Sequence, residues 1–153
     1  MRKYLFPIAL AALLSGTALA VAANSSGNFT ARITIVAGCN VSAGDLNFPN
    51  TSTIAGTENT TSTVTIKCTK STPYALSLTN VTLIASATTT AAGTMTNTVT
   101  PTETIAYNID FVGSSVGTGT GANQTHTLRG TLATQNTPVP GSYLDARSIY
   151  VVY

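Results

Sequence analysis

The residues best suited to acid–base or nucleophilic chemistry are few in this chain. His126 is the only histidine, and it lies in the segment Gln124-Thr125-His126-Thr127 beside a glycine-rich stretch. A catalytic base needs a positioned nucleophile and usually an orienting carboxylate, and in a chain this rich in serine and threonine a nearby hydroxyl is weak evidence. We therefore expect His126 to lie at a strand edge or on the surface, and we expect the protein not to be an enzyme.

The acidic residues offer a second route to chemistry, because two carboxylates suffice for glycoside hydrolysis. Five are spread along the chain, but there is no tryptophan to stack against a sugar ring. The sequence also contains no phosphate-binding loop, HExxH motif or EF-hand loop. It therefore predicts no catalytic residue, no metal site, no cofactor and no small-molecule substrate.

Cys39 and Cys68 are the only cysteines. A zinc site needs four ligands, and one histidine and two thiols do not supply them. In an exported chain, an even number of cysteines favours a disulfide. We therefore predict a Cys39–Cys68 bridge, which by the loop-entropy model contributes about 3–4 kcal/mol.

Export is predicted by the first 22 residues. Arg2 and Lys3 are followed by an apolar run over residues 5–14 and by two overlapping A-x-A sites ending at Ala20 and Ala22. This order is typical of a secretory signal peptide, and the run is shorter than the roughly 20 apolar residues of a membrane-spanning helix. The alternative is an N-terminal membrane anchor. We expect a signal peptide over residues 1–22 and one domain over residues 23–153.

The charge of the mature chain excludes one class of partner. Without Arg2 and Lys3, five cationic side chains face five carboxylates, and the cations are not clustered. Proteins that bind nucleic acid need clustered lysine and arginine to neutralise phosphates. We therefore expect no nucleic-acid partner, whereas an uncharged surface suits a protein that packs against copies of itself.

Alternation of apolar and polar residues predicts strands along the mature chain. In residues 28–36 the apolar face comprises Phe29, Ala31, Ile33 and Ile35, opposite Thr30, Arg32 and Thr34. Further extended segments are predicted over residues 39–41, 46–48, 63–68, 74–78, 81–85, 105–111, 125–133 and 148–153.

The segments between these strands are rich in turn-forming residues. Residues 86–102 predict a loop or a weak edge hairpin, and residues 113–123, with their glycines, predict a long flexible connection. No helical periodicity lasts over three turns outside the first 22 residues. About seven to nine short strands with turns between them predict an all-β sandwich with Greek-key connections.

Three features in order along the chain carry a resemblance to a known family. An alternating strand runs directly into Cys39, Leu46-Asn47-Phe48 follows, and Gly141-Ser142-Tyr143-Leu144-Asp145 precedes a final strand that ends in Tyr153. Together with the paired cysteines and the export sequence, this arrangement resembles the spore coat protein U family, the pilin subunits of archaic chaperone–usher pili. Pro49 departs from the glycine that often follows the Leu-x-Phe element, and residues 86–102 match no part of the pattern.

The resemblance implies an immunoglobulin-like (pilin) β-sandwich that lacks its last strand and is completed by a donor strand from another subunit. Residues 24–37 would be the donor-strand extension, with Phe29, Ala31, Ile33 and Ile35 as its inserting side chains. Tyr150, Val151, Val152 and Tyr153 would form the strand at the groove edge. The implied partners are identical or related pilin subunits, a periplasmic chaperone and an outer-membrane usher.

The implied function is a cell-surface or extracellular pilus that supports adhesion and biofilm formation. Two other interpretations stay open at this point. A spore or cell-envelope coat protein would share the fold and form a layer, and a small carbohydrate-binding adhesin would need a receptor site within a chain that has room for one domain.

Overall fold

The structure is a computed structural model that describes residues 23–153. The chain divides into two units, one ending at Ile33 and one comprising Thr34–Tyr153. Residues 23–38 contain no helix or strand. The predicted signal peptide lies outside the described residues.

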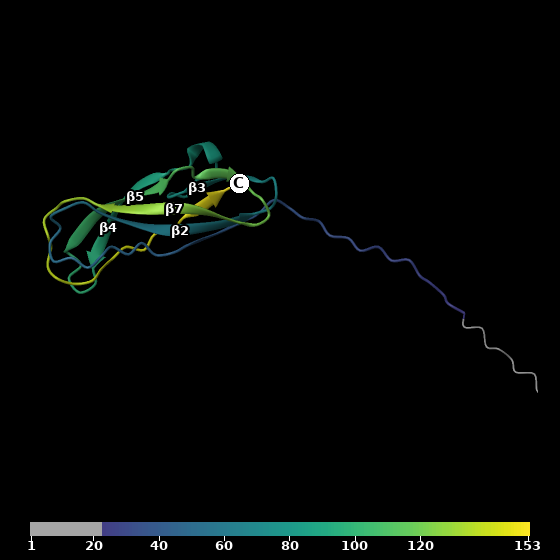
Figure 1. The fold of residues 1–153 in the computed structure, drawn as a ribbon, viewed down its shortest axis with the longest axis horizontal. Coiled ribbons are helices and arrows are strands. Elements are labelled where there is room, and N and C mark those ends of the chain that lie inside the picture. Colours follow the sequence, from purple (N-terminus) through teal and green to yellow (C-terminus); the bar gives the residue numbers. More distant parts are fainter. Residues whose placement is uncertain (1–22) are drawn as a thin grey trace, which may run out of the picture. The chain divides into compact units, whose positions relative to one another are not determined.

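The second unit is built from nine strands and one short 3₁₀ helix, η1, at Ile84–Ser86 (Figure 1). This confirms the all-β prediction and the predicted number of strands. The strands are β1 Cys39–Ala43, β2 Glu58–Cys68, β3 Pro73–Ser77, β4 Thr90–Asn97, β5 Thr104–Val112, β6 Val116–Thr118, β7 Asn123–Leu132, β8 Tyr143–Leu144 and β9 Tyr150–Val152.

The strands form two sheets, as expected for a sandwich. The larger has the order β1-β2-β7-β5-β4-β8, and the smaller has the order β6-β3-β9. Every pairing is antiparallel. The long strands β2 and β7 lie side by side (Figure 1), with Val64 opposite His126 and Ser62 opposite Leu128. Antiparallel sheets can bury one face and expose the other, which matches the alternating sequences of these strands.

The core lies between the sheets and follows the predicted periodicity. Val64 and Ile66 of β2 are fully buried, while the threonines between and before them are more exposed. β-branched residues fit a pleated, half-buried surface, so threonine on the outer face and valine or isoleucine on the inner face both favour a strand here. The buried core cluster comprises Ile54, Val64, Ile66, Cys68, Tyr74, Leu76, Leu78, Tyr107, Ile109, Phe111, Leu128 and Leu132.

Four local predictions were wrong. Residues 46–48 and residues 81–85 form no strand, and part of the second segment is helix η1. Residues 86–102 contain the eight-residue strand β4, which pairs with β5 on one side and with β8 on the other. Residues 113–123 contain strand β6, which pairs with β3. Small residues gave no clear periodicity in the last two segments, and their strands are specified by neighbouring strands that supply hydrogen bonds.

Candidate functional site

Four strands of the second unit, β1, β8, β6 and β9, stand at the end of a sheet and have one edge without a strand partner. β1 ends the larger sheet, and β9 ends the smaller sheet. The two strands contact one another, but they form no ladder of backbone hydrogen bonds. An unpaired edge presents a row of N–H and C=O groups that can template another strand. The sandwich therefore has two available edges at the same place.

A cavity of about 340 Å³ lies between the chain that follows β1 and the chain that precedes β9. One wall comprises residues 43–46, and the other comprises residues 145–149. The floor is apolar and is formed by Leu78, Ile109 and Leu128 of the core. We call this cavity the edge groove. Its composition suits an extended segment that inserts apolar side chains and offers backbone hydrogen bonds to the walls.

The wall that precedes β9 is held by the carboxylate of Asp145. Asp145 Oδ2 accepts hydrogen bonds from Tyr107 Oη at 3.0 Å and from the Thr94 backbone N–H at 3.3 Å. It also lies 3.7 Å from Arg147 Nη1, which donates a hydrogen bond to the Ala92 carbonyl. These bonds attach the chain between the two sheets to β4 and β5.

Tyr107 is the buried member of this arrangement. Burial, with the hydrogen bond to Asp145 and the negative charge of Asp145, raises the pKa of Tyr107 to about 12, although Arg147 lowers it. Its ring crosses Gly93, where a Cβ atom would lie 2.3 Å from a ring carbon. Glycine at position 93 therefore provides the space through which Tyr107 reaches Asp145.

The predicted donor residues lie outside any strand in this structure. Phe29, Ala31, Ile33 and Ile35 are all exposed, and the segment that carries them has no ladder partner. The regular alternation that predicts a strand is therefore present in the sequence, but the lone chain does not form one here. Whether a second subunit supplies the partner stays a prediction.

The predicted C-terminal strand forms, although it is shorter than residues 148–153. β9 pairs with β3, with Val152 opposite Ala75 and Val151 opposite Leu76. Val151 packs against the core and Val152 is buried, whereas Tyr150 and Tyr153 are exposed. Ile149, just before β9, lines the edge groove.

The predicted disulfide is present. Cys39 and Cys68 are bonded, and no free cysteine occurs in the described residues. The two residues are opposite one another in the β1–β2 ladder. The bridge therefore fixes the point at which the N-terminal segment enters the sandwich.

His126 is half-buried between the sheets instead of lying freely on the surface. Its Nδ1 is 2.8 Å from the Ser114 carbonyl oxygen, and its Nε2 is 2.9 Å from Tyr74 Oη. Because a carbonyl only accepts, Nδ1 carries a proton, and when the ring holds no second proton Nε2 accepts from Tyr74 Oη. Burial raises the pKa of Tyr74, which also favours its role as a donor. His126 thus links β7 to β3 and to the chain before β6.

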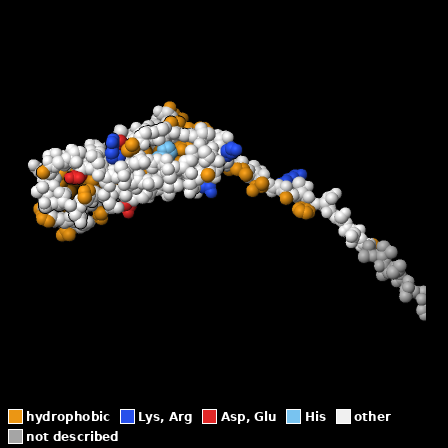
Figure 2. Space-filling view, viewed as in Figure 1, with side chains coloured by type: hydrophobic (Ala, Val, Ile, Leu, Met, Phe, Trp, Pro, Cys, Tyr) orange, Lys and Arg blue, Asp and Glu red, His pale blue; other side chains and the backbone are white. Residues whose placement is uncertain are grey.

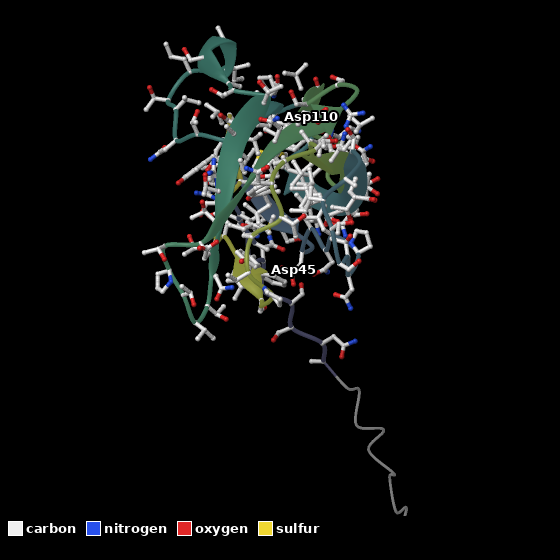
Figure 3. The ribbon with its side chains drawn as sticks, turned by 90° about the vertical axis from the view of Figure 1, so that its left-hand side faces the viewer. Asp45 and Asp110 are labelled. Carbon is white, nitrogen blue, oxygen red and sulfur yellow. A yellow bond between two sulfur atoms is a disulfide. The ribbon has the colours of Figure 1, made fainter. Side chains whose placement is uncertain are left out.

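Of the five acidic side chains of the described residues, only Asp45 and Asp145 line the edge groove. Asp110 forms an ion pair with Arg129 at 2.8 Å, and it lies apart from Asp45 on the domain (Figure 3). Charged side chains are scattered over the face shown in Figure 2. No group of three potential metal ligands occurs in residues 23–153.

The sequence reasoning missed most of the edge groove. Its walls at residues 43–46 and 145–149, and its floor, come from five separate parts of the chain. The Gly141-to-Asp145 segment of the resemblance reaches the start of one wall, but nothing in the sequence placed the two walls opposite one another.

Comparison with known families assigns this fold. Residues 25–149 match the family model for the Spore Coat Protein U domain. No curated protein matches the chain. Within the described residues, no helix is long and apolar enough to cross a membrane. The family comprises structural subunits of pilus type at the cell surface. The match covers most of the chain and every strand of the sandwich except β9, so this protein belongs to the Spore Coat Protein U domain family.

Proposed function

We propose that this protein is a structural subunit of a chaperone–usher pilus and that it polymerises by donor-strand complementation. In this proposal, residues 24–37 of one subunit fill the edge groove of the next. A periplasmic chaperone covers the groove before assembly, an outer-membrane usher exports the fibre, and the fibre supports adhesion and biofilm formation. The protein catalyses no reaction.

One observation carries the proposal: the chain contains both an apolar groove with unpaired strand edges and an exposed segment with matching alternation. A strand added between the two edges gains backbone hydrogen bonds, and its alternate side chains fill the groove. Burying one phenylalanine or isoleucine side chain contributes about 1.5–3 kcal/mol. Thr30, Arg32 and Thr34 would face outward and tolerate substitution.

The arrangement also supports growth into a fibre. The donor and the acceptor are different surfaces of the same chain, so the contact joins subunits head to tail. Such a contact propagates into a filament when its rotation does not close a ring. It also covers edges that would otherwise aggregate.

The C-terminal strand has a specific part in this proposal. Tyr150, Val151, Val152 and Tyr153 would border the groove and pair first with the chaperone and then with the donor strand. Removing residues 148–153 should abolish recovery of the chaperone complex from the periplasm. A normal yield of that complex after the truncation would contradict this assignment.

The decisive substitution is Ile33→Asp in the exported protein. A carboxylate in an apolar pocket costs several kcal/mol, so fibre growth should stop while the chaperone-bound subunit remains folded. Thr34→Asp is the matched control, because it adds the same charge on the outward face, and fibres should still form. The measurements are electron microscopy of sheared surface material and circular dichroism of the purified complex.

A shortened chain that begins at Ala37 tests the same proposal without the donor segment. It should fold with the chaperone and accept a synthetic peptide of residues 28–37. If it never folds, residues 28–36 belong to their own domain and the donor assignment is wrong. Sheets in place of fibres in electron micrographs would favour the coat-layer function, and specific binding on a glycan array would favour the adhesin.

A further inference from the structure

The N-terminal segment carries a single charged side chain. Arg32 is the only charged residue in residues 23–38, and it lies on the polar side of the alternating pattern. No ion pair involves Arg32 in the described residues. A strand inserted with Ala31 and Ile33 toward the groove floor therefore presents one guanidinium at the groove rim.

The groove rim carries one carboxylate without a partner. Of the two carboxylates that line the groove, Asp145 is bonded by Tyr107 and Thr94 and lies beside Arg147. Asp45, on the opposite wall, is exposed, and no hydrogen bond or ion pair to its side chain occurs in the described residues (Figure 3). Because the charges of Asp145 and Arg147 offset one another, the rim has a net negative charge at Asp45.

The remaining charges do not compete for this place. Asp110 and Arg129 pair with each other on β5 and β7. Glu58 and Lys67 lie in β2, Lys70 follows β2, and Glu103 precedes β5. None of these residues lines the groove.

We propose that Arg32 of one subunit pairs with Asp45 of the next and so fixes the register of the inserted strand. The inference rests on the proposed function, since it requires the segment to occupy the edge groove. Adjacent strands lie about 4.8 Å apart, so an inserted strand beside residues 43–45 brings its outward side chains next to theirs. The long methylene stem of Arg32 can lie along the rim while its charged end reaches Asp45.

This pair would select one register over its neighbours. A shift by one residue turns the apolar side chains away from the floor, so alternation alone excludes it. A shift by two residues keeps Ala31, Ile33 and Ile35 on the inner face, and alternation cannot exclude it. Such a shift moves Arg32 along the rim by about 7 Å and separates it from Asp45. The charge pair thus discriminates between registers that the alternation of apolar and polar residues does not distinguish.

The test is a charge exchange in the full chain, because every junction of the polymer contains one Arg32 and one Asp45. Fibres are prepared from the wild type, Arg32→Glu, Asp45→Lys and the variant with both substitutions. The measurement is the rate at which polymer dissociates at fixed temperature and low salt. Each single exchange should accelerate dissociation about fivefold, as expected for an exposed ion pair, and the double exchange should restore most of the wild-type rate.

Two matched controls separate a pair from a general effect of charge. Lys67→Glu changes an exposed charge and Glu58→Lys changes a half-buried one. Neither residue lines the groove, and both variants should leave the rate within about twofold. In about 1 M salt the difference between single and double exchanges should disappear, because the Debye length falls to about 3 Å. If Arg32→Glu or Asp45→Lys prevents folding, the neutral variants Arg32→Gln and Asp45→Asn are measured in their place.

The outcomes distinguish the two proposals. If polymers form and the double exchange is as unstable as the two single exchanges combined, the Arg32–Asp45 pair is wrong and donor-strand insertion is unaffected. If the wild-type chain forms no polymer and the peptide of residues 28–37 does not bind, the proposed function itself fails.

Discussion

Two segments of this protein have the same pattern of residues and different surroundings. Residues 28–36 and strand β5 both alternate apolar and polar side chains over about nine positions. In β5, Ile109 is 3% exposed and Phe111 is 7% exposed, whereas Phe29 is 91% exposed and Ile33 is 86% exposed. The pattern therefore specifies which side chains share a face, and it does not specify which chain buries that face.

The difference lies in the hydrogen-bond partners. β5 pairs with β4 over residues 104–110 and with β7 over residues 108–112, so each part of the strand has at least one ladder partner. Residues 28–36 have no neighbouring strand in the lone chain. An extended segment without a partner gains no ladder hydrogen bonds and still loses backbone entropy if it is ordered. A second subunit with an open groove would supply the missing ladder hydrogen bonds and would bury the apolar face.

The strongest test of this contrast places the same charge in both segments. Ile109→Asp should prevent folding, because an unpaired carboxylate in the core costs several kcal/mol in addition to the lost apolar burial. Ile33→Asp should change the stability of the unpolymerised subunit by no more than about 0.5 kcal/mol. The measurement is urea unfolding of the exported chain. A large loss of stability in the Ile33 variant would show that residues 28–36 pack within their own domain.

The disulfide lies where the exposed N-terminal segment meets the first strand of the sandwich. Replacing Cys39 and Cys68 together by alanine should lower the free energy of unfolding by about 3–4 kcal/mol, since the bridge closes a 29-residue separation. The denaturation midpoint measures this loss. Thiol titration of the unfolded, unreduced wild type should detect no free thiol, and two free thiols would contradict the bridge in the exported protein.

A smaller effect should come from Tyr107, which connects β5 to the groove wall. Its pKa is about 12 in the folded chain, compared with 10.0 for an ordinary tyrosine. The folded state therefore favours the protonated phenol, and this contribution is fully present below pH 10 and is lost as the pH rises toward 12. Between these values the wild type should lose about 1–2 kcal/mol of stability relative to Tyr107→Phe.

The comparison with Tyr107→Phe isolates this residue, because the other tyrosines titrate in both proteins. Near neutral pH, Tyr107→Phe should itself cost about 1 kcal/mol, since Asp145 loses a hydrogen-bond donor. Parallel pH dependences of the two proteins above pH 10 would show that the pKa of Tyr107 is not raised in the folded chain.

The smallest effects are expected on the outward faces of both segments. Asn108 of β5 and Thr34 of the N-terminal segment are exposed, and neither forms a side-chain hydrogen bond in the structure. Asn108→Ala and Thr34→Ala should each change the free energy of unfolding of the subunit by less than about 0.5 kcal/mol. Thermal unfolding measures both, and a larger change at Thr34 alone would indicate a contact within the subunit.

Long segments with strong alternation were predictable from the sequence. The predicted strand over residues 105–111 corresponds to β5, and the segment over residues 125–133 corresponds to β7. β4 and β6 were missed because alanine, glycine and threonine give little contrast between faces. Such strands form because neighbouring strands pair with them, and a pairing partner distant in sequence leaves no local pattern.

The sequence by itself determined the all-β class, the faces of the long strands and the pairing of Cys39 with Cys68. These properties depend on residue type and short-range spacing. Only the tertiary structure decided that β1 and β9 keep free edges, that residues 43–46 face residues 145–149, and that Asp45 lies free while Asp145 is bonded. The physical reason is that an edge, a groove and a free charge are defined by what does or does not lie beside them, and those neighbours come from distant parts of the chain.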